Sequence, residues 1–316
     1  MKPKFAIGVD LGATTVKTGL VSSSGKILYQ NKLPTNGHLG PSAVIQQIEL
    51  SVRDAMVHAD GKKPAGIGIG APGVVDDEGV VKWPPNMKRW NEVPLAREVK
   101  KIFRRYQIKV ENDANAAAIA ESKFGAGRKF PDFLFVIWGT GVGGGIILDH
   151  KIYRGPSGGA GEIGHISINY EGPKCNCGNY GCVESYVGQR YLSQRTAERL
   201  KDQPESMIAQ LVGGDFTKLE PMYIAQAAQQ GDRLAREMLA EAATLLGVAL
   251  AGVMNTMDLR VSIIGGGISA AGGFVLQAVE ESVRSRVLTP LRRDIKVLQA
   301  QLGNNAGILG AAGLVL

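Results

Sequence analysis

The stretch Gly159 to Glu184 reads GAGEIGHISINYEGPKCNCGNYGCVE, and the interpretation of the whole fold starts from it. It contains His165 together with all three cysteines of the chain, Cys175, Cys177 and Cys182. Three thiolates and one imidazole form a complete tetrahedral set for zinc, which binds sulfur and nitrogen donors and fills four positions when its role is structural. Because no position is left for a water molecule, we expect this metal to build shape rather than to catalyse.

The alternative is that the three cysteines are ordinary buried residues, since free cysteine often packs as a small apolar side chain. Their close spacing favours the metal site. The residues Gly178 to Gly181 allow the chain to double back before the last cysteine, because glycine accepts the positive φ that a tight return needs.

Two carboxylates flank the predicted metal ligands. Glu162 lies just before the histidine and Glu184 just after the last cysteine. A loop held by metal would present both carboxylates from a rigid base, as recognition of a polyhydroxyl ligand by hydrogen bonds requires.

The composition is that of a globular protein apart from its glycines. The chain has 316 residues, of which 44% are hydrophobic and 42 are glycine. This length suits two domains with sizeable cores. The glycines gather in short clusters beside apolar runs, so we interpret them as tight turns and as loops that approach phosphates closely.

The charge pattern argues against a nucleic-acid partner. The net charge is +7, but Lys and Arg are spread along the chain, and a mildly basic surface also suits nucleotides. The start of the chain lacks the apolar run of a secretory signal, and the uncharged run 133–148 is shorter than the ~18 residues of a spanning helix. With no disulfide expected, we predict a cytoplasmic protein without a membrane partner.

The first candidate ligand loop joins two predicted strands, 5–10 and 16–21. The first strand ends in Asp10, and Gly12 and Thr14 lie in the turn. Backbone N–H groups in such a turn can cradle a phosphate, and the aspartate can hold a hydrated Mg²⁺. The alternative is a plain hairpin, because Asp and Gly favour turns in any case.

A second candidate loop follows a predicted helix at 41–59 and a strand at 65–70. The strand runs into Ala71-Pro72-Gly73, where the bare backbone of Gly73 can approach a ligand closely. The segment 83–95 contains three prolines and is predicted as an irregular loop, in which Asn86 is either a ligand donor or a turn former.

The predicted strand 108–110 leads through Asn112 and Asp113 into an alanine-rich helix at 114–124. One interpretation is that Asp113 is only the N-cap of this helix. The other is functional: a carboxylate at this junction lies at the carboxyl edge of the sheet, where open α/β sheets bind ligands. The positive end of the helix would keep Asp113 ionised and ready to accept a hydroxyl proton.

A glycine-rich hairpin follows, in which strand 133–138 leads into GTGVGGG at 139–145 and then into a strand at 146–148. Close approach of a polyphosphate explains this turn better than flexibility does. Residues 184–257 are predicted to be largely helical, with a long buried helix at 233–257 and a less certain linker at 213–218.

The last candidate loop is a triple glycine. A strand at 260–264 opens into Gly265 to Gly267, and a helix begins at Phe274. Strand, glycine turn and helix form a nucleotide-binding arrangement in several folds. A strand at 295–302 and an apolar helix at 306–316 complete the chain.

The order of these signals resembles the ROK family of sugar kinases and sugar-responsive repressors, within the actin and hexokinase superfamily. The resemblance covers essentially the whole chain. Its most specific parts are GEIGH with CNCGNYGC at 161–182, ENDANAAA at 111–118 and GTGVGGG at 139–145.

The resemblance implies an α/β protein of two ribonuclease-H-like domains of the actin and hexokinase type, with a cleft between them. By analogy with the family, residues 1–114 with 304–316 form the smaller domain. Residues 115–303 form the larger one, which carries the structural zinc loop 165–182. Relatives commonly pair as homodimers.

The resemblance also implies an ATP-dependent hexose kinase, with glucokinase the favoured activity. Asp113 matches the base that takes a proton from the sugar hydroxyl. His165 would serve the metal through one ring nitrogen and the sugar through the other. The positions that match sugar-binding residues are Gly73, Asn112, Asp113, Glu162, His165 and Glu184.

The nucleotide would be ATP with Mg²⁺. The phosphate and Mg²⁺ loops correspond to Asp10, Gly12, Thr14, Thr140 and Gly141, and the adenosine side corresponds to Gly265, Gly266 and Gly267. The chain departs from the family pattern at Ala13, where many relatives have glycine, and at Trp138, where a small aliphatic residue is usual. Neither departure removes a functional group.

Two other functions remain open. One is a kinase for another hexose or N-acetylhexosamine, such as N-acetylmannosamine, N-acetylglucosamine, fructose or allose, because the hydroxyl-binding set is shared across these. The other is a sugar-sensing regulator without activity. Retention of Asp113 and of both phosphate loops disfavours it, as does the short stretch before Asp10, which has no room for a DNA-binding module. A polyphosphate donor is disfavoured by the triple-glycine adenosine region.

Overall fold

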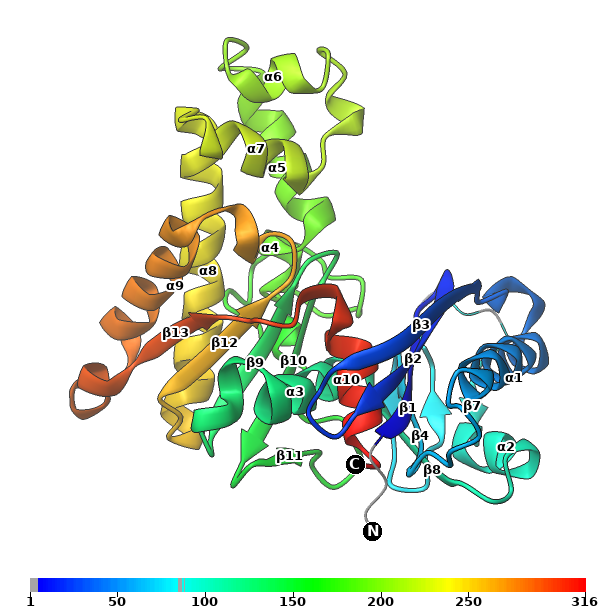
Figure 1. Cartoon of the computed structure of the whole chain (residues 1–316). Coiled ribbons are helices and arrows are strands. Elements are labelled where there is room, and N and C mark those ends of the chain that lie inside the picture. Colours follow the sequence, from blue (N-terminus) through cyan, green and yellow to red (C-terminus); the bar gives the residue numbers. More distant parts are fainter. Residues whose placement is uncertain (1–4, 85–86, 88) are drawn as a thin grey trace. The chain divides into compact units, whose positions relative to one another are not determined.

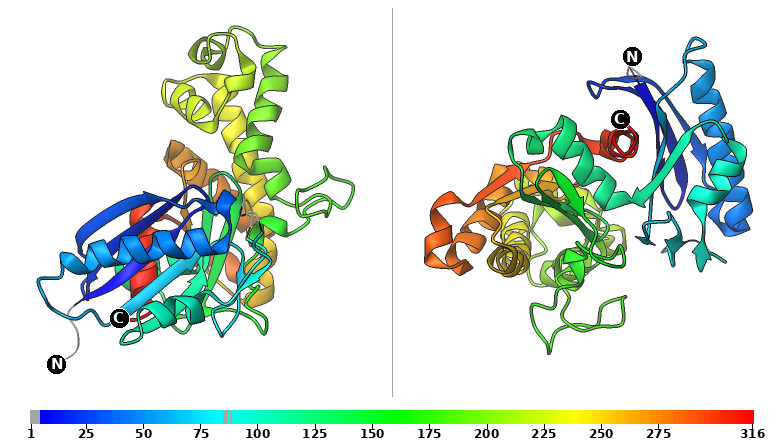
Figure 2. Two further views of the ribbon diagram at one scale, coloured as in Figure 1. Left: turned by 90° about the vertical axis from the view of Figure 1, so that its right-hand side faces the viewer. Right: turned by 90° about the horizontal axis from the view of Figure 1, so that it is seen from below.

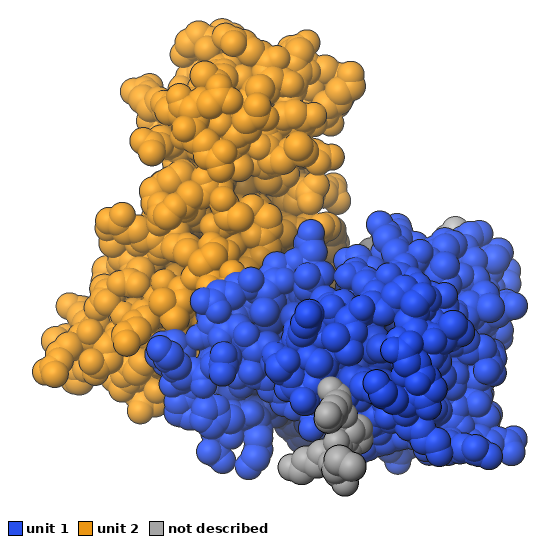
Figure 3. All heavy atoms as spheres, in the orientation of Figure 1, with its two compact units in different colours: residues 1–131, 145–161, 301–316 blue, residues 132–144, 162–300 orange. Residues whose placement is uncertain are grey.

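The chain folds into a mixed α/β structure (Figure 1). The computed structural model describes residues 5–84, 87 and 89–316. Its internal contacts divide it into two compact units, coloured separately in Figure 3. Unit 1 comprises residues 1–131, 145–161 and 301–316, and unit 2 comprises residues 132–144 and 162–300.

Unit 1 is built on a five-stranded sheet with the order β3-β2-β1-β4-β8. The first three strands are antiparallel neighbours, whereas β4 and β8 run parallel to β1. The strands β1, β4 and β8 therefore end at the same edge of the sheet, as the pairs Asp10 with Gly70 and Ala71 with Asn112 show. The strands are β1 (Phe5–Leu11), β2 (Thr15–Ser22), β3 (Ile27–Pro34), β4 (Gly66–Ala71) and β8 (Gln107–Asn112).

Helices cover both faces of this sheet (Figure 2, right). On one face α1 packs against β2 and β3, and α2 packs against α1. On the other face α10 packs against β1, β4 and α3. These helices are α1 (Pro41–Val57), α2 (Leu95–Ile102), α3 (Asp113–Phe124) and α10 (Ala306–Gly313). A small sheet of β5 (Val74–Val75), β6 (Val81–Lys82) and β7 (Glu92–Val93) completes the unit.

The helix α10 meets its neighbours backbone to backbone. A Cβ atom added to Gly68 of β4 would lie 1.7 Å from the carbonyl oxygen of Ala311. One added to Gly310 would lie 1.7 Å from the carbonyl oxygen of Ala116 in α3. Glycine is required at these positions because any side chain would collide with main chain that cannot move aside.

Replacement of Gly310 by alanine is therefore expected to destabilise unit 1 by about 3 kcal/mol, because the added methyl group forces the helices apart. Gly252 is a matched control: it is an exposed helical glycine with nothing within 4 Å of an added Cβ. Gly252→Ala should stabilise its helix by about 1 kcal/mol. Thermal unfolding of both variants checks this contrast, and an unchanged melting temperature for Gly310→Ala would contradict the close contact.

Unit 2 contains three parallel strands with β12 in the middle, between β9 and β13. They are β9 (Phe133–Trp138), β12 (Val261–Gly265) and β13 (Lys296–Gln299). After β9 the chain turns at residues 139–141 into β10 (Val142–Leu148), as the glycine hairpin predicted. The boundary between the units falls inside β10, whose second half pairs with β11 (Lys151–Tyr153) in unit 1.

Helices form most of the rest of unit 2 outside the loop 166–183, and α8 is the longest of them. The predicted helix 233–257 is confirmed at both ends. Among the described residues α8 alone is long and apolar enough, by length and composition, to cross a membrane. However, 56% of its apolar window is buried, and it packs against α9 and α7. The helices are α4 (Glu184–Val187), α5 (Gln189–Leu200), α6 (Met207–Leu211), α7 (Pro221–Gln229), α8 (Arg233–Met257) and α9 (Gly273–Arg286).

Two sequence predictions differ from the structure. The compact units divide after Pro131 rather than after residue 114, because α3 packs against α10 and so belongs with unit 1. The segment 83–95, predicted as an irregular loop, contains the short strand β7. Residues 184–257 are largely helical, as predicted, with a break at Gly188 between α4 and α5.

Candidate functional site

The four predicted metal ligands come together in unit 2. The ligand atoms of His165, Cys175, Cys177 and Cys182 all lie within 4.8 Å of one another. The Sγ atoms of Cys177 and Cys182 are 3.7 Å apart, and Cys175 Sγ lies 3.8 Å from His165 Nδ1. Two sulfur ligands about 2.3 Å from a tetrahedral zinc ion would be about 3.8 Å apart. The donor set and its spacing therefore fit zinc.

The surroundings of the sulfurs act on them unequally, since the Asn179 N–H lowers the pKa of the Cys177 thiol. Burial raises the pKa of the Cys182 thiol to about 12 and raises the pKa of Cys175 as well. A cation is needed to hold such sulfurs as thiolates at neutral pH. The loop itself is closed by a hydrogen bond of 2.8 Å from Cys175 N–H to the Asn179 carbonyl, and Gly178 takes the predicted positive φ of 95°.

The orientation of His165 links this cluster to Glu162. Its Nδ1 faces the sulfur of Cys175, whereas Nε2 lies 4.0 Å from Glu162 Oε2. The two ring nitrogens thus have different neighbours, as the predicted double use of this side chain requires. Both side chains are partly exposed, so a ligand can reach them.

Glu184 connects the metal loop to the glycine hairpin. It is the first residue of α4, and its Oε2 accepts a hydrogen bond of 2.9 Å from Val142 N–H. A Cβ atom on Gly141 would lie 2.3 Å from the same oxygen. The sequence predicted Glu184 as a ligand-binding carboxylate but did not predict that it also braces the glycine turn.

The second group of predicted residues lies in unit 1, where β8 meets α3. Asn112 is the N-cap of α3: its Oδ1 accepts from Asn115 N–H at 3.0 Å, and its Nδ2 donates to the Gly73 carbonyl at 3.0 Å. The prediction that Asp113 is the N-cap is therefore wrong, because Asn112 takes that place. Asp113 is the first helical residue, and its Oδ1 accepts the N–H of Ala114 at 2.8 Å. It stays at the positive end of the helix.

Gly73 is held close to this junction. It has a φ of 90°, and an added Cβ would lie 2.6 Å from the Lys82 carbonyl oxygen. The structure thus brings Gly73, Asn112 and Asp113 together. Asn86 lies outside the described residues.

Glu111 supports the junction between β8 and α3, a role that the sequence did not predict. Its side chain is 1% exposed. Oε1 accepts from Asn112 N–H and from Asn115 Nδ2, each at 3.0 Å, and Oε2 accepts from Arg154 Nε at 2.5 Å. Arg154 is 43 positions further along the chain, so no local pattern pointed to this ion pair. Glu111 fixes the backbone that carries Asn112 and Asp113.

We expect Glu111→Ala to destabilise the protein by about 1–3 kcal/mol, because it leaves the buried Asn115 amide without its acceptor and removes the partner of the partly exposed Arg154. Glu98→Ala is the control, since Glu98 pairs with Lys101 at the surface and such pairs contribute less than about 1 kcal/mol. Thermal unfolding should separate the two variants. Similar melting temperatures would show that the Glu111 network contributes little.

The turn after β1 presents exposed backbone, as predicted for a phosphate loop. Gly12 N–H donates to the Thr15 carbonyl at 2.9 Å, and Thr35 Oγ1 donates to the Gly12 carbonyl at 2.7 Å. Ala13 and Thr14 are exposed at the tip. Beside the turn, Asp10 lies 3.5 Å from Lys17 Nζ.

Burial raises the pKa of Asp10, and the nearby Lys17 only partly offsets this effect. A carboxylate that burial makes harder to ionise gains from a nearby cation. Asp10 therefore fits a place beside a hydrated Mg²⁺.

The two glycine segments of unit 2 meet at Trp138. Its indole is fully buried and donates to the Val187 carbonyl at 2.9 Å, which explains how the chain accommodates this unusual residue. A Cβ atom on Gly266 would lie 2.2 Å from the Trp138 carbonyl oxygen. The glycine turn is held in addition by Gln189 N–H, which lies 3.1 Å from the carbonyl oxygens of Gly139 and Thr140.

The predicted residues are thus divided between the two units. Unit 1 carries Asp10, Gly12, Thr14, Gly73, Asn112 and Asp113. Unit 2 carries Thr140, Gly141, Glu162, His165, Glu184, Gly265, Gly266, Gly267 and the three cysteines.

Comparison with known proteins decides the family. A family model described as ROK family matches residues 6–316. The chain belongs to the ROK family. The resemblance inferred from the sequence motifs is thereby confirmed, together with the predicted α/β fold of the actin and hexokinase type.

Similar ROK proteins include enzymes and a regulator. The chain is 35% identical to a glucokinase of Thermotoga maritima, over 98% of this chain and 96% of that protein. A crystal structure of a ROK family glucokinase from Streptomyces griseus in complex with glucose and AMPPNP matches with a TM-score of 0.84 and 37% identity, over 98% of each chain. A xylose repressor of Caldicellulosiruptor bescii is 32% identical, over 98% of this chain but 77% of that protein.

Proposed function

We propose that this ROK protein is an ATP-dependent hexose kinase, and specifically a glucokinase that converts ATP and D-glucose to ADP and glucose 6-phosphate. The observation that carries the proposal is similarity over nearly the full length of both chains to the glucokinases of T. maritima and S. griseus, the latter solved with glucose and AMPPNP. The carboxylate of Asp113 at the start of α3 supplies the chemistry that this reaction needs.

In the proposed reaction Asp113 accepts the proton of the sugar hydroxyl as its oxygen bonds to the γ-phosphorus. The bond from that phosphorus to the oxygen of ADP breaks, and ADP leaves. Charge stabilisation and positioning account for most of the catalysis in such transfers. The remaining hydroxyls would be held by Asn112, Glu162, His165 and Glu184, with a contribution from the backbone at Gly73.

The phosphates of ATP would be held by backbone N–H groups and hydroxyls in the two glycine turns. These are the turn with Gly12 and Thr14 and the turn with Thr140 and Gly141, while Gly265, Gly266 and Gly267 would face the adenosine. Asp10 would hold a hydrated Mg²⁺, which supplies neutralisation of phosphate charge. The Cys₃His cluster would hold zinc in a structural role, fixing His165 and the flanking carboxylates.

Two alternatives are retained. The same side chains suit the hydroxyls of N-acetylmannosamine, N-acetylglucosamine, fructose or allose, so the hexose is chosen on similarity rather than on geometry. A sugar-sensing regulator is suggested by the likeness to xylose repressors. The T. maritima glucokinase is more similar to the chain, at 35% identity against 32% for the xylose repressor, which supports the kinase.

A coupled assay of ADP release across a panel of hexoses tests the proposal. We expect the highest kcat/KM for D-glucose, and no ADP release without a sugar. Turnover of another hexose alone would correct the substrate, whereas no turnover with any of them would reject the kinase. A homodimer and a cytoplasmic location stay predictions, and light scattering after size exclusion tests the first.

A further inference from the structure

Cys177 is the accessible member of the proposed zinc cluster. This residue is exposed, whereas Cys175 and Cys182 are buried, with exposed fractions of 3% and 0%. The thiolate is the form of cysteine that reacts with oxidants, and among several thiolates the accessible one is oxidised first. A small oxidant that arrives from solvent therefore meets the sulfur of Cys177 before the other two.

The second sulfur needed for a disulfide lies beside the first. The Sγ atoms of Cys177 and Cys182 are 3.7 Å apart, whereas a disulfide bond measures about 2.05 Å. Residues 178–180 between the two cysteines are exposed, and Gly178 and Gly181 lie at positive φ, of 95° and 68°. A short exposed turn with two glycines can adjust its backbone, so the sulfurs can close the gap without disturbing a packed core.

We propose that the zinc loop is a redox-sensitive site, in which a hydroperoxide oxidises Cys177 and Cys182 to a disulfide and so causes loss of the metal. First, the thiolate sulfur of Cys177 bonds to one peroxide oxygen, the O–O bond breaks, hydroxide leaves, and Cys177 becomes a sulfenic acid. Next, the thiolate of Cys182 bonds to the sulfur of Cys177, the S–O bond breaks, and a second hydroxide leaves. Two electrons thus pass from the two sulfurs to the peroxide.

The disulfide would remove the support of His165. Because disulfide sulfurs do not serve as zinc ligands, only Cys175 and His165 of the four donors would remain. The change also reaches α4, since the Cys182 carbonyl accepts hydrogen bonds from the hydroxyl and the N–H of Ser185, at 2.6 and 2.9 Å. Both effects act on proposed sugar-binding residues, His165 and the neighbouring Glu184, so oxidation should weaken sugar binding.

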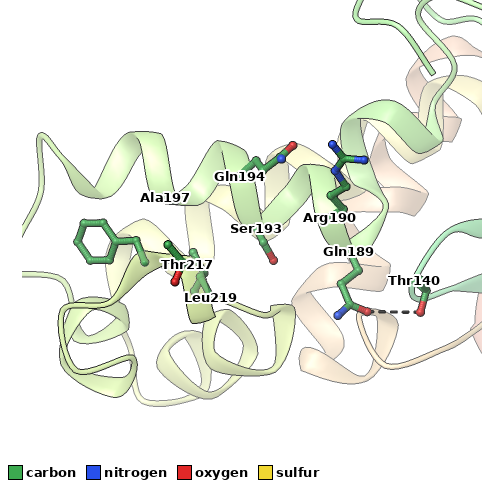
Figure 4. Close-up of a pocket in the computed structure, with 9 residues that line it drawn as sticks. Thr140, Gln189, Arg190, Ser193, Gln194, Ala197, Thr217 and Leu219 are labelled. Atoms are coloured by element: carbon green, nitrogen blue, oxygen red, sulfur yellow. Dashed lines mark hydrogen bonds between the residues drawn. The ribbon is translucent and has the colours of Figure 1, made fainter. Parts of the chain in front are cut away.

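The proposed phosphate turn is held by groups that contain no sulfur. Gln189, the first residue of α5, meets Thr140 through its side chain, whose Oε1 lies 3.4 Å from the threonine hydroxyl (Figure 4). The cavity that extends from this contact along α5 has no cysteine among the described residues that line it. Oxidation should therefore change the KM for ATP less than the KM for the sugar.

The test follows the sulfurs and the metal directly. The zinc-loaded protein is treated with a small excess of hydrogen peroxide, and a chromogenic chelator reports the zinc that is released. Free thiols are then alkylated, and chymotrypsin cleaves after Tyr180, between Cys177 and Cys182. We expect mass spectrometry to find the two peptides joined by a disulfide between Cys177 and Cys182, with the alkyl group on Cys175.

Activity gives a second readout. The sugar KM should rise by about tenfold on oxidation, the usual size of effect when the support of a metal ligand is lost. Dithiothreitol with added zinc should restore both the zinc content and the KM, because thiols reduce disulfides by exchange.

Cys177→His is the matched variant, because histidine is a zinc ligand that cannot form a disulfide. It should keep its zinc at the peroxide dose that empties the wild type. Asn176→Ser is the control: it changes an exposed residue of the same loop, keeps all four ligands and should respond as the wild type does. If Cys177→His does not fold or does not bind zinc, the disulfide map of the wild type decides the question alone.

The inference rests on the proposed zinc site and not on the kinase activity, so the two can fail separately. Zinc retained by the oxidised wild type, or zinc lost with Cys175 in the disulfide, would overturn the redox site and leave the kinase intact. Absence of zinc from the untreated protein would reject the metal site and this inference with it. Zinc release with the expected disulfide in a protein inactive on every hexose would support the redox site and reject the kinase.

Discussion

Asp113→Asn is expected to lower the kcat of hexose phosphorylation by about 10²- to 10⁴-fold, the usual contribution of a positioned general base. The amide cannot take the proton of the attacking hydroxyl. It is nevertheless the same size as the carboxylate, and its oxygen can still accept the hydrogen bond from Ala114 N–H. We therefore expect the fold and the affinity for the sugar to change little.

The measurement is steady-state kinetics together with sugar binding by calorimetry. Asp60→Asn is a matched control, because Asp60 is exposed and its positive φ of 49° suits asparagine. The control should keep full activity. A near-normal kcat in Asp113→Asn would remove this residue from the role of base, and loss of sugar binding would indicate a positioning role instead.

Cys177→Ser should remove the metal and raise the sugar KM by at least about tenfold. A serine hydroxyl is a poor zinc ligand, and three remaining donors cannot complete the tetrahedral set. His165 would then lose the metal ion that fixes its ring, and its Nε2 would no longer be held beside Glu162. Because Cys177 is exposed, the substitution itself creates no core cavity.

Elemental analysis and kinetics check this prediction together. Asn176→Ser is the control, since it changes an exposed residue of the same loop and keeps all four ligands. One zinc per chain is expected in the control and none in Cys177→Ser. Full zinc content in Cys177→Ser would defeat the ligand assignment, whereas loss of zinc with an unchanged KM would separate the metal from sugar binding.

The sequence was most informative where the signal is local. The ligands from Cys175 to Cys182 are close in the chain, so their spacing alone indicated one site, and the structure places their atoms within 4.8 Å. The long helix Arg233–Met257 was predicted from a run whose middle is apolar, and the structure confirms both ends and adds that Asp232 caps the first turn. The junction of Asn112 and Asp113 was found for the same reason, although the cap was assigned one residue late.

Contacts between distant parts of the chain could not be predicted in this way. Glu111 looked like an ordinary residue at the end of a strand until the structure paired it with Arg154. Glu184 was expected only to bind the ligand, yet its carboxylate also accepts a hydrogen bond from Val142 N–H. No periodicity in the sequence links such partners, because side-chain packing alone brings them together.

The sequence by itself determined the order of strands, turns and helices and the residues that carry the proposed chemistry, because turn formation, capping and metal spacing act over a few residues. Tertiary structure alone decided that α3 belongs with α10, and hence where the two units divide. The reason is that Gly68 and Gly310, which are far apart in the sequence, let the main chain of α10 contact the main chain of β4 and of α3.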